Sequence, residues 1–348
     1  MSEARSIEKQ LEDLNLNAPT INPYEFFEDR PTQFAGIGSF AIKPIPAGTR
    51  ILCEPPLFVL PDDADILQIY RAVTSRPIED QMPFWALSQN VTKFKETDWI
   101  ATLRANYSGD DDAAFEDLVE AHESALAIYE TNRFTVRTSS GSDHHMGMFP
   151  NAARLNHSCR PNVFHRFNTH LGRLTIHALR DIRPGEELLT SYIDICAATP
   201  ERRRVLRHWG FKCLCTLCKA KNSEQEWRRK RLAELMGKMK RAEARRTEES
   251  WQQWDFAKAL GVAEEVIRLM EEEGLEESDT LGEAYGTAAD YAIEIGWHDT
   301  AIRWAEKALA IERKCCGEDS PEYDKARLLL EYARKDLELG KPKPVSVI

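Results

Sequence analysis

The sequence predicts an α+β protein in which a strand-rich region with a helical insertion is followed by a wholly helical region. Residues 23–60 and 131–199 contain short apolar runs separated by Pro and Gly turns, which is typical of strands. Residues 61–130 and 223–340 instead carry apolar residues at helical spacing. Between them, residues 200–222 hold a group of cysteines. A chain of 348 residues is long enough for more than one hydrophobic core.

Composition and charge narrow the classes of function. The formal net charge of −11 argues against a broad nucleic-acid surface, so we expect no direct nucleic-acid partner. The first residues lack an apolar signal segment, and no later run is long enough to span a bilayer, so we expect a soluble protein of the nucleus, the cytoplasm or both. Eight cysteines, partly grouped at metal-ligand spacing, favour a reducing compartment over a disulfide framework.

The predicted elements follow in chain order. Residues 1–22 are a polar lead, and residues 23–60 contain strands at 51–53 and 57–60. In the helical insertion, residues 61–130, the clearest helical spacing covers residues 66–73 and 115–129. Strands are predicted again at 134–136, 163–167, 174–179 and 188–193.

The C-terminal region, residues 223–340, has an internal repeat. Residues 262–267 align with residues 304–309, a period of about 42 residues, and alanines along both copies allow helices to pack closely. This pattern resembles a tetratricopeptide-like array of helix pairs. Because the repeats are too few for a long solenoid, we expect the array to pack against the strand-rich region, and it is a candidate surface for a protein partner.

Four cysteines have the spacing of a zinc site. Cys213, Cys215 and Cys218 form a C-x-C-x-x-C motif, and three thiolates leave a tetrahedral site incomplete. Cys159, within an N-H-x-C motif, supplies the fourth ligand in this interpretation. We therefore predict one structural zinc ion per chain, with no coordination position left for catalysis.

Together these motifs resemble the SET-domain lysine methyltransferases. The resemblance includes a G-x-G segment at residues 34–41, the N-H-x-C motif at 156–159, a G-E-E-L-x-x-x-Y signature at 185–192, and a cysteine-rich post-SET segment at 200–222. It makes residues 23–60 and 131–199 the two parts of the SET domain. Residues 131–136 and 149–155 are similar to the SMYD branch. Residues 61–129 contain no cysteine, so the MYND zinc finger of that branch is absent, as is common among fungal SET proteins.

The resemblance implies a protein-lysine N-methyltransferase that uses S-adenosylmethionine on a histone or another protein. Gly36 and Gly38 would let the backbone approach the methyl donor, and Phe211 would provide an aromatic face for its adenine. The cofactor-binding residues implied by the resemblance are Gly36, Ile37, Gly38, Asn132, Ala153, Asn156, His157, Tyr192 and Phe211.

Tyr192 is the predicted catalytic residue, because a phenol at the mouth of a narrow channel can orient the attacking amine. Trp209 is predicted to line the same channel, where the SMYD branch usually has a second tyrosine. This departure leaves the methylation state of the product open.

Two other functions remain open: an inactive interaction protein and a SET fold adapted to a small-molecule substrate. Several residues also receive plain structural interpretations. We expect His144 and His145 in an exposed loop, His165 and His177 as ordinary strand residues, and residues 228–231 on a solvated helix face.

Overall fold

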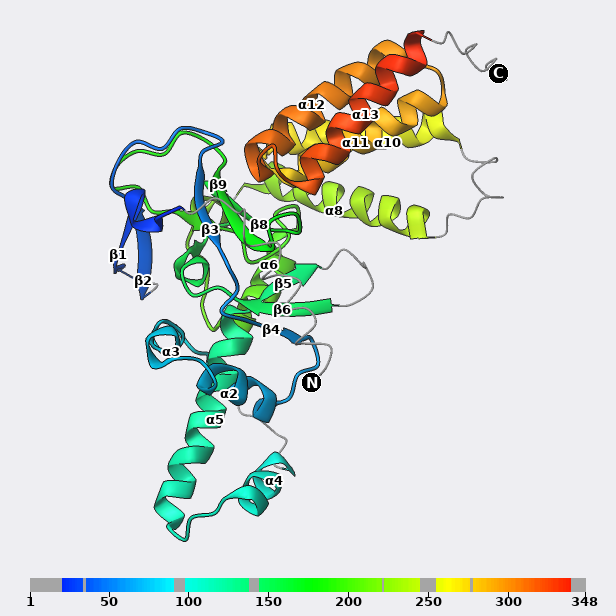
Figure 1. Ribbon diagram of the computed structural model, residues 1–348. Helices are drawn as coiled ribbons and strands as arrows, with labels where there is room; N and C mark the ends of the chain where they lie inside the picture. Colours follow the sequence, from blue (N-terminus) through cyan, green and yellow to red (C-terminus); the bar gives the residue numbers. More distant parts are fainter. Residues whose placement is uncertain are drawn as a thin grey trace.

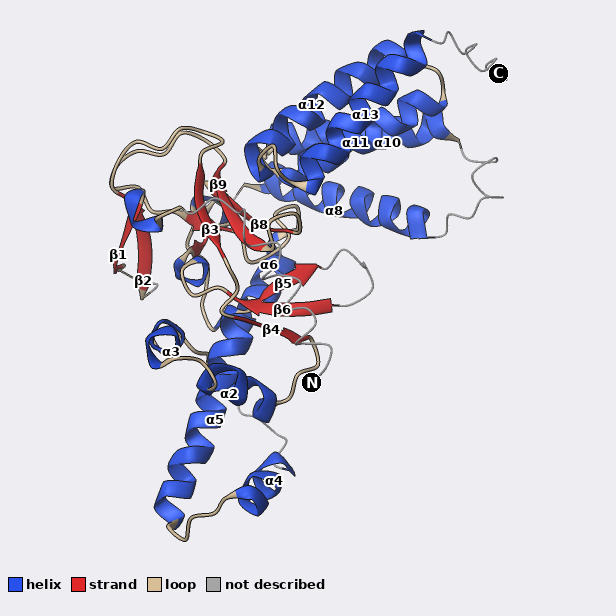
Figure 2. Ribbon diagram, in the orientation of Figure 1, coloured by secondary structure: helices blue, strands red, loops and turns tan. Residues whose placement is uncertain are grey.

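The computed structural model of this chain describes residues 21–33, 36–90, 98–137, 144–220, 222–244, 255–275 and 278–338. Strands occupy the centre of the molecule, with one group of helices beyond them at each side (Figure 1). The colouring by secondary structure shows the same separation between strands and the C-terminal helices (Figure 2). The predicted α+β class is confirmed. Residues 1–20 of the predicted lead and residues 34–35 of the G-x-G segment lie outside the described ranges.

The described strands form four small sheets at the centre. A hairpin pairs β1 (Phe27–Pro31) with β2 (Ile37–Ala41). One three-stranded sheet has the order β3 (Arg50–Glu54), β9 (Arg173–Ala178), β8 (Val163–Asn168), and another the order β4 (Phe58–Pro61), β6 (His144–Met148), β5 (Phe134–Arg137). The fourth pairs β7 (Asn156–His157) with β10 (Leu189–Thr190) in parallel.

The short β7–β10 sheet brings two of the motifs side by side. Asn156 pairs with Leu189 and His157 with Thr190, so the N-H-x-C motif lies next to the end of the G-E-E-L signature. The observed strand β10 has only two residues, fewer than the strand predicted at residues 188–193, because the chain leaves the sheet after Thr190. A core of Ile51, Leu174 and neighbouring apolar side chains supports this region from β2, β3, β8 and β9.

The described residues of the insertion form four helices: α2 (Ile66–Thr74), α3 (Ile78–Trp85), α4 (Asp98–Asn106) and α5 (Asp112–Asn132). Asp65 begins α2 with a reciprocal capping box to Gln68. Apolar residues of α2 and α5, among them Ile69 and Tyr129, pack against Phe58 of β4. Asn132 is the last residue of α5, and β5 begins at Phe134, where the sequence predicts a strand.

The cysteine-rich segment is built from short helices: α6 (Thr199–Leu206), the 3₁₀ turn η3 (Arg207–Trp209) and α7 (Thr216–Lys219). Two other 3₁₀ turns are η1 (Pro23–Glu25) and η2 (Ala152–Arg154). Such short elements bury little apolar surface by themselves.

The C-terminal region contains α8 (Ser223–Ala244), α10 (Phe256–Glu272), α11 (Asp279–Glu294), α12 (His298–Cys316) and α13 (Pro321–Glu338). The helices repeat at the predicted period: α12 begins at residue 298 against 256 for α10, and α13 at 321 against 279 for α11, 42 residues apart in each case. Buried alanines such as Ala288 and Ala301 let these helices approach closely. Across the described ranges, no helix combines the length and the apolarity that a membrane crossing requires.

The C-terminal helices pack against the central strands, as the sequence predicted. Leu179, Ile195 and Cys196 of the strand-rich region join the core of the helical region. Two arginines of the strands reach across as well: Arg50 of β3 pairs with Asp319, and Arg166 of β8 pairs with Asp279. The two regions therefore share both apolar and ionic contacts.

Two structural interpretations from the sequence are wrong. Arg229 does not lie on a solvated face, because its side chain is 1% exposed and pairs with the fully buried Glu273 at the end of α10. An isolated buried charge is costly, and the ion pair offsets that cost. His145 does not lie in an exposed loop, because β6 pairs with both β4 and β5 and buries it.

Candidate functional site

The four predicted zinc ligands lie together. Their sulfur atoms are all within 4.8 Å of one another, with Cys159 Sγ 3.5 Å from Cys218 Sγ and 4.0 Å from Cys213 Sγ. A tetrahedron with Zn–S bonds of about 2.3 Å has edges of about 3.8 Å. The cluster, which also includes Cys215, therefore fits a zinc ion held by four thiolates. Its position beside the buried Leu206 would shield the ion from water.

His157 connects this cluster to the predicted catalytic residue. Its Nδ1 accepts a hydrogen bond from the backbone N–H of Tyr192 at 3.1 Å, and its Nε2 lies 3.3 Å from Cys159 Sγ. Burial lowers the pKa of His157 to about 4, so the ring is neutral near pH 7. With Nδ1 as acceptor, the ring proton is on Nε2 and points to the sulfur. His157 therefore holds the backbone at Tyr192 in place.

A cavity of about 420 Å³ lies beside the cluster, and we call it the first cavity. It is lined by seven of the nine predicted cofactor-binding residues: Ile37, Asn132, Ala153, Asn156, His157, Tyr192 and Phe211. These residues come from β2, α5, η2, β7 and two segments that follow β10. Trp209 and two of the cysteines also line it. Residues that are distant in sequence thus surround one space.

Gly36 and Gly38 flank Ile37 but are not among the residues that line this cavity. Gly36 has a φ of +70°, which a residue with a side chain rarely adopts. A Cβ at Gly38 would lie 2.5 Å from Glu187 Oε1 and 2.8 Å from Asn156 Nδ2. The backbone conformation thus favours glycine at position 36, and close packing favours glycine at position 38. The sequence analysis included neither reason.

The amide groups of the two predicted asparagines hold the walls of the cavity. Asn156 Nδ2 donates to the carbonyl of Ile37 at 3.1 Å and to Glu187 Oε1 at 2.9 Å. Asn132 Nδ2 donates to the carbonyls of Ser88 and Ile128, each at 2.7 Å. Because the amino groups are used in this way and no described residue donates to either Oδ1 oxygen, these oxygens are available to a ligand.

The segment that carries Trp209 and Phe211 is tied to the end of α5. Trp209 Nε1 donates to the carbonyl of Thr131 at 2.9 Å, and His208 Nε2 lies 3.2 Å from the carbonyl of Glu130. Asn90, from the loop after α3, donates to the carbonyl of His208. The segment is thus fixed to the insertion at one end and joined to the cysteine cluster at the other.

A second cavity, of about 460 Å³, lies on the other side of Tyr192. Both cavities are lined by Thr131, Asn132, Ala153, Tyr192 and Trp209. The second cavity is also lined by apolar side chains, including Phe134 of β5, Leu174 of β9, and Leu155, which follows η2. Tyr192 and Trp209, with ring centroids 5.2 Å apart, therefore stand in the wall between two spaces.

The hydroxyl hydrogen of Tyr192 already takes part in a hydrogen bond. Tyr192 Oη donates to the carbonyl of Leu155 at 2.6 Å. Burial raises the pKa of Tyr192, so the phenol stays protonated near pH 7. Toward a ligand, Tyr192 can therefore offer only the lone pairs of its oxygen, which makes it a hydrogen-bond acceptor rather than a base.

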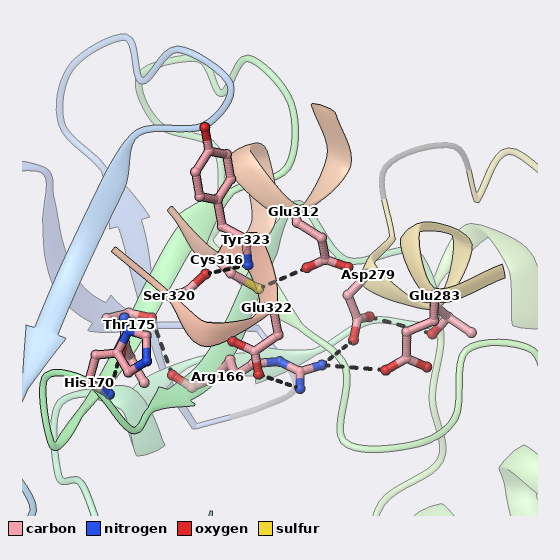
Figure 3. Close-up of polar contacts among 12 residues, drawn as sticks. Arg166, His170, Thr175, Asp279, Glu283, Glu312, Cys316, Ser320, Glu322 and Tyr323 are labelled. Atoms are coloured by element: carbon pink, nitrogen blue, oxygen red, sulfur yellow. Dashed lines mark hydrogen bonds and ion pairs between the residues drawn. The ribbon is translucent and has the colours of Figure 1, made fainter. Parts of the chain in front are cut away.

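One wall of the second cavity comes from the C-terminal helices. Asp279 of α11 and Glu322 of α13 line it together with Arg166 of β8. Arg166 lies between the two carboxylates, 2.7 Å from Asp279 Oδ2 and 3.1 Å from Glu322 Oε1 (Figure 3). A third carboxylate, Glu283, lies 3.9 Å from the same guanidinium. One arginine thus faces three acidic side chains, which leaves an excess of negative charge.

Sequence reasoning missed several residues of the two cavities. Glu187 lies within the quoted G-E-E-L signature but received no role, although it lines the first cavity. His165 was interpreted as an ordinary strand residue, although it lines the second cavity. Ser88 and Asp279 come from regions outside the motifs, and no local signal could have assigned them.

Comparison with known proteins identifies the central region. Residues 36–193 match the family described as the SET domain. The chain is 35% identical over 224 residues to "Histone-lysine N-methyltransferase set5" of Schizosaccharomyces pombe, covering 61% of this chain and 58% of that protein. It is 32% identical over 146 residues to "Histone-lysine N-methyltransferase SMYD3" of Homo sapiens, covering 39% and 32%. The chain thus spans less than two thirds of the length of either relative.

Among solved structures, the chain is similar to one described as "Crystal structure of the SET domain of LSMT bound to Lysine and AdoHcy". The TM-score is 0.38 at 13% sequence identity, over 97% of this chain and 92% of that one.

Proposed function

Because residues 36–193 match the SET domain and the chain is similar to proteins of the SMYD branch, we propose that it is an S-adenosylmethionine-dependent protein-lysine N-methyltransferase. The observation that carries the proposal is the wall shared by the two cavities, with Tyr192 and Trp209 in it. A methyl donor in the first cavity and a lysine side chain in the second would meet at this wall. Holding two reactants in line can lower a barrier by about 7 to 11 kcal/mol.

The first cavity suits the methyl donor. Its volume of about 420 Å³ lies within the range of small-molecule sites, roughly 300 to 1,000 Å³. Phe211, 37% exposed, offers a ring face for the adenine, and the Oδ1 atoms of Asn132 and Asn156 can accept hydrogen bonds from the donor. A zinc ion on the four cysteines would hold the segment with Phe211 over this cavity.

Bound there, S-adenosylmethionine supplies a methyl group: the amine nitrogen forms the new N–C bond while the C–S bond breaks and its electron pair stays on sulfur. A lysine ammonium, with a pKa of about 10.4, must first lose a proton to water. The apolar side chains of the second cavity, among them Phe134 and Leu155, favour the neutral amine by desolvation, whereas Asp279 and Glu322 in its other wall favour the ammonium form. Tyr192 Oη, whose own hydrogen is held by Leu155, accepts an N–H of this amine and turns its lone pair toward the methyl group.

The proposed substrate is a lysine of a histone or another protein, consistent with the names of the relatives. Such substrates occur in the nucleus and the cytoplasm, where we expect this protein. The C-terminal helices contribute Asp279 and Glu322 to the second cavity, so they can contact the substrate as well as a further protein partner.

Replacing Tyr192 with Phe tests the proposal. The variant should bind S-adenosylmethionine with unchanged affinity in calorimetry, because the hydroxyl faces the amine. Transfer of labelled methyl groups from S-adenosylmethionine to a histone mixture or a cell extract should fall about 10- to 100-fold, which corresponds to about 1.4 to 2.7 kcal/mol.

Tyr129→Phe is the matched control, since Tyr129 is also buried but lies in the core of the insertion. It should leave transfer unchanged. Equal transfer by the Tyr192 variant and the wild type would remove Tyr192 from its role. Binding of the donor without transfer to any protein would favour the inactive interaction protein, and transfer to free amines alone would favour a small-molecule substrate.

A further inference from the structure

His165 is a histidine in the second cavity to which the proposed mechanism gives no role. It lies on β8 and lines the same space as Tyr192 and Phe134. Its ring meets Phe134 edge to face, with centroids 5.2 Å apart and an interplanar angle of 85°. Packing therefore fixes the orientation of the ring within the cavity.

One nitrogen of the ring has a partner. His165 Nδ1 lies 2.7 Å from the hydroxyl oxygen of Thr190, a buried residue of β10. Among the hydrogen bonds of the described residues, the other nitrogen, Nε2, has no partner. Thr190 is two positions before Tyr192, so the backbone that places Tyr192 also places the partner of His165.

The ring is neutral near pH 7. Burial, followed by the charge of Arg166, lowers the pKa of His165 to about 4. A neutral imidazole has one N–H and one bare nitrogen. If Nδ1 carries the proton and donates to Thr190, Nε2 is a bare acceptor that does not take up a proton at neutral pH.

On the basis of the proposed function, we propose that His165 Nε2 accepts the second N–H of the target amine, opposite Tyr192. This hydrogen bond restricts the enzyme to adding a single methyl group. A neutral primary amine has two N–H groups and one lone pair. With one N–H on Tyr192 Oη and the other on His165 Nε2, the lone pair has one direction left, toward the methyl donor.

A second methyl transfer would break this arrangement. The monomethylated amine has one N–H, so its methyl group must lie against either Tyr192 Oη or His165 Nε2. That acceptor would lose its hydrogen bond while buried, which costs about 1 to 3 kcal/mol. Two donors that line the cavity are already used, because Trp209 Nε1 donates to Thr131 and Ser191 Oγ donates to Ile193.

The main test uses His165→Leu, which introduces an apolar side chain of similar size and removes the acceptor nitrogen Nε2. Full-length wild type and variant are incubated with S-adenosylmethionine and a histone mixture, and the products are separated by mass spectrometry. The wild type should give monomethyl-lysine, and the variant should raise the ratio of dimethyl- to monomethyl-lysine at least 5-fold. His165→Gln, whose side-chain oxygen can accept the same hydrogen bond, should stay close to the wild-type ratio.

His122→Leu is the matched control. His122 is also a buried histidine with a lowered pKa and one bonded nitrogen, but it lies on α5 within the insertion. It should leave the ratio of products unchanged. The proposal is overturned if His165→Leu transfers methyl groups with the wild-type ratio, or if the wild type itself produces mainly trimethyl-lysine.

A second measurement does not depend on activity. Nitrogen-detected NMR of ring-labelled histidine reports which nitrogen carries the proton, and the signal missing in His165→Gln identifies His165. We expect a proton on Nδ1 of the wild type, and a shift toward the other tautomer in Thr190→Val. A proton on Nε2 of the wild type would overturn the proposal even if transfer occurs. Absence of transfer with a proton on Nδ1 would instead count against the proposed function.

Discussion

The cysteine-rich segment and the C-terminal helices are stabilised in different ways. Around the cysteine cluster, the described core consists of Cys159, Leu206, Cys213 and Leu217, of which the two leucines lie on helices of eight residues or fewer and the two cysteines lie outside helices. The C-terminal helices, of 16 to 22 residues, bury a continuous apolar face. The first region lacks the apolar surface to fold by itself, whereas the second has it.

The two cavities therefore depend on different interactions, metal binding in one case and packed helices with ion pairs in the other. The first cavity is closed by the segment that carries Phe211, whose order we expect to depend on a metal ion. The second cavity is completed by Asp279 and Glu322, whose helices are already folded and are held to the strands by Arg166. Changes to each region should therefore affect one cavity and leave the other in place.

The largest expected effect follows from Cys215→Ser. Structural zinc binding contributes about 10 to 16 kcal/mol in small domains, and three thiolates with one hydroxyl bind the ion much more weakly. The variant should lose its zinc, and its affinity for S-adenosylmethionine should fall at least 10-fold. Metal analysis and calorimetry measure both, while the thermal transition of the C-terminal helices should remain.

Cys53→Ala is the control, because Cys53 is a buried cysteine of β3 outside the cluster. It should retain about one zinc per chain. A wild-type protein that contains no zinc after purification would contradict the assignment of the cluster, and so would a Cys215 variant with a full zinc content.

The next effect concerns the contact between the two regions. Arg166→Met leaves Asp279 and Glu322 without their cation, although their side chains are only 15% and 26% exposed. These side chains are partly buried, and removing one partner of a fully buried pair costs about 3 to 5 kcal/mol, which sets the upper limit here. Urea denaturation should therefore show a loss of stability up to this limit. Adding Asp279→Asn to the variant should recover part of the loss.

Arg334→Met gives the reference for an exposed ion pair, because Arg334 and its partner Glu306 are 56% and 53% exposed. We expect a loss of less than about 1 kcal/mol. If both arginine variants lose the same small amount, the contact through Arg166 does not hold the two regions together.

The smallest effect is a dependence of stability on pH. Glu312 of α12 lies near Arg166 and Cys316 (Figure 3), and burial raises its pKa to about 7 from an ordinary value of 4.5. The folded state therefore binds this proton more tightly than the unfolded state. The stability contributed is fully present below about pH 4.5 and is lost as the pH rises through 7.

Glu312→Gln removes this titration. The variant should match the wild type near pH 5 and exceed it near pH 8, by at most about 3 kcal/mol. Denaturation curves at both pH values measure the difference. Glu306→Gln, on the exposed face of the same helix, shows the effect of removing one surface carboxylate. An equal response of the two variants would contradict the role of burial at Glu312.

Much of this molecule followed from local sequence patterns. The C-x-C-x-x-C spacing indicated a metal site, and the period of about 42 residues indicated paired helices. Tyr192 and Phe211 were predicted from motifs, and both line the first cavity. Such features are visible because spacing along a helix, turn or loop is fixed over a few residues.

Pairings over long distances in the chain were not visible in the same way. Arg229 belonged to a basic run typical of an exposed face, yet it pairs with Glu273, 44 residues later. Arg166 meets Asp279 113 residues later. The sequence around His165 is typical of a strand, and only the fold brings Thr190 of β10 beside its ring.

The sequence by itself determined the α+β class, the SET motifs and the four cysteines that gather at one point. Only the tertiary structure decided which side chains share the wall between the cavities, which charges are buried, and which nitrogen of His165 meets Thr190. The reason is physical: local spacing follows from bond geometry, whereas burial and long-range pairing depend on how all the packed elements exclude water together.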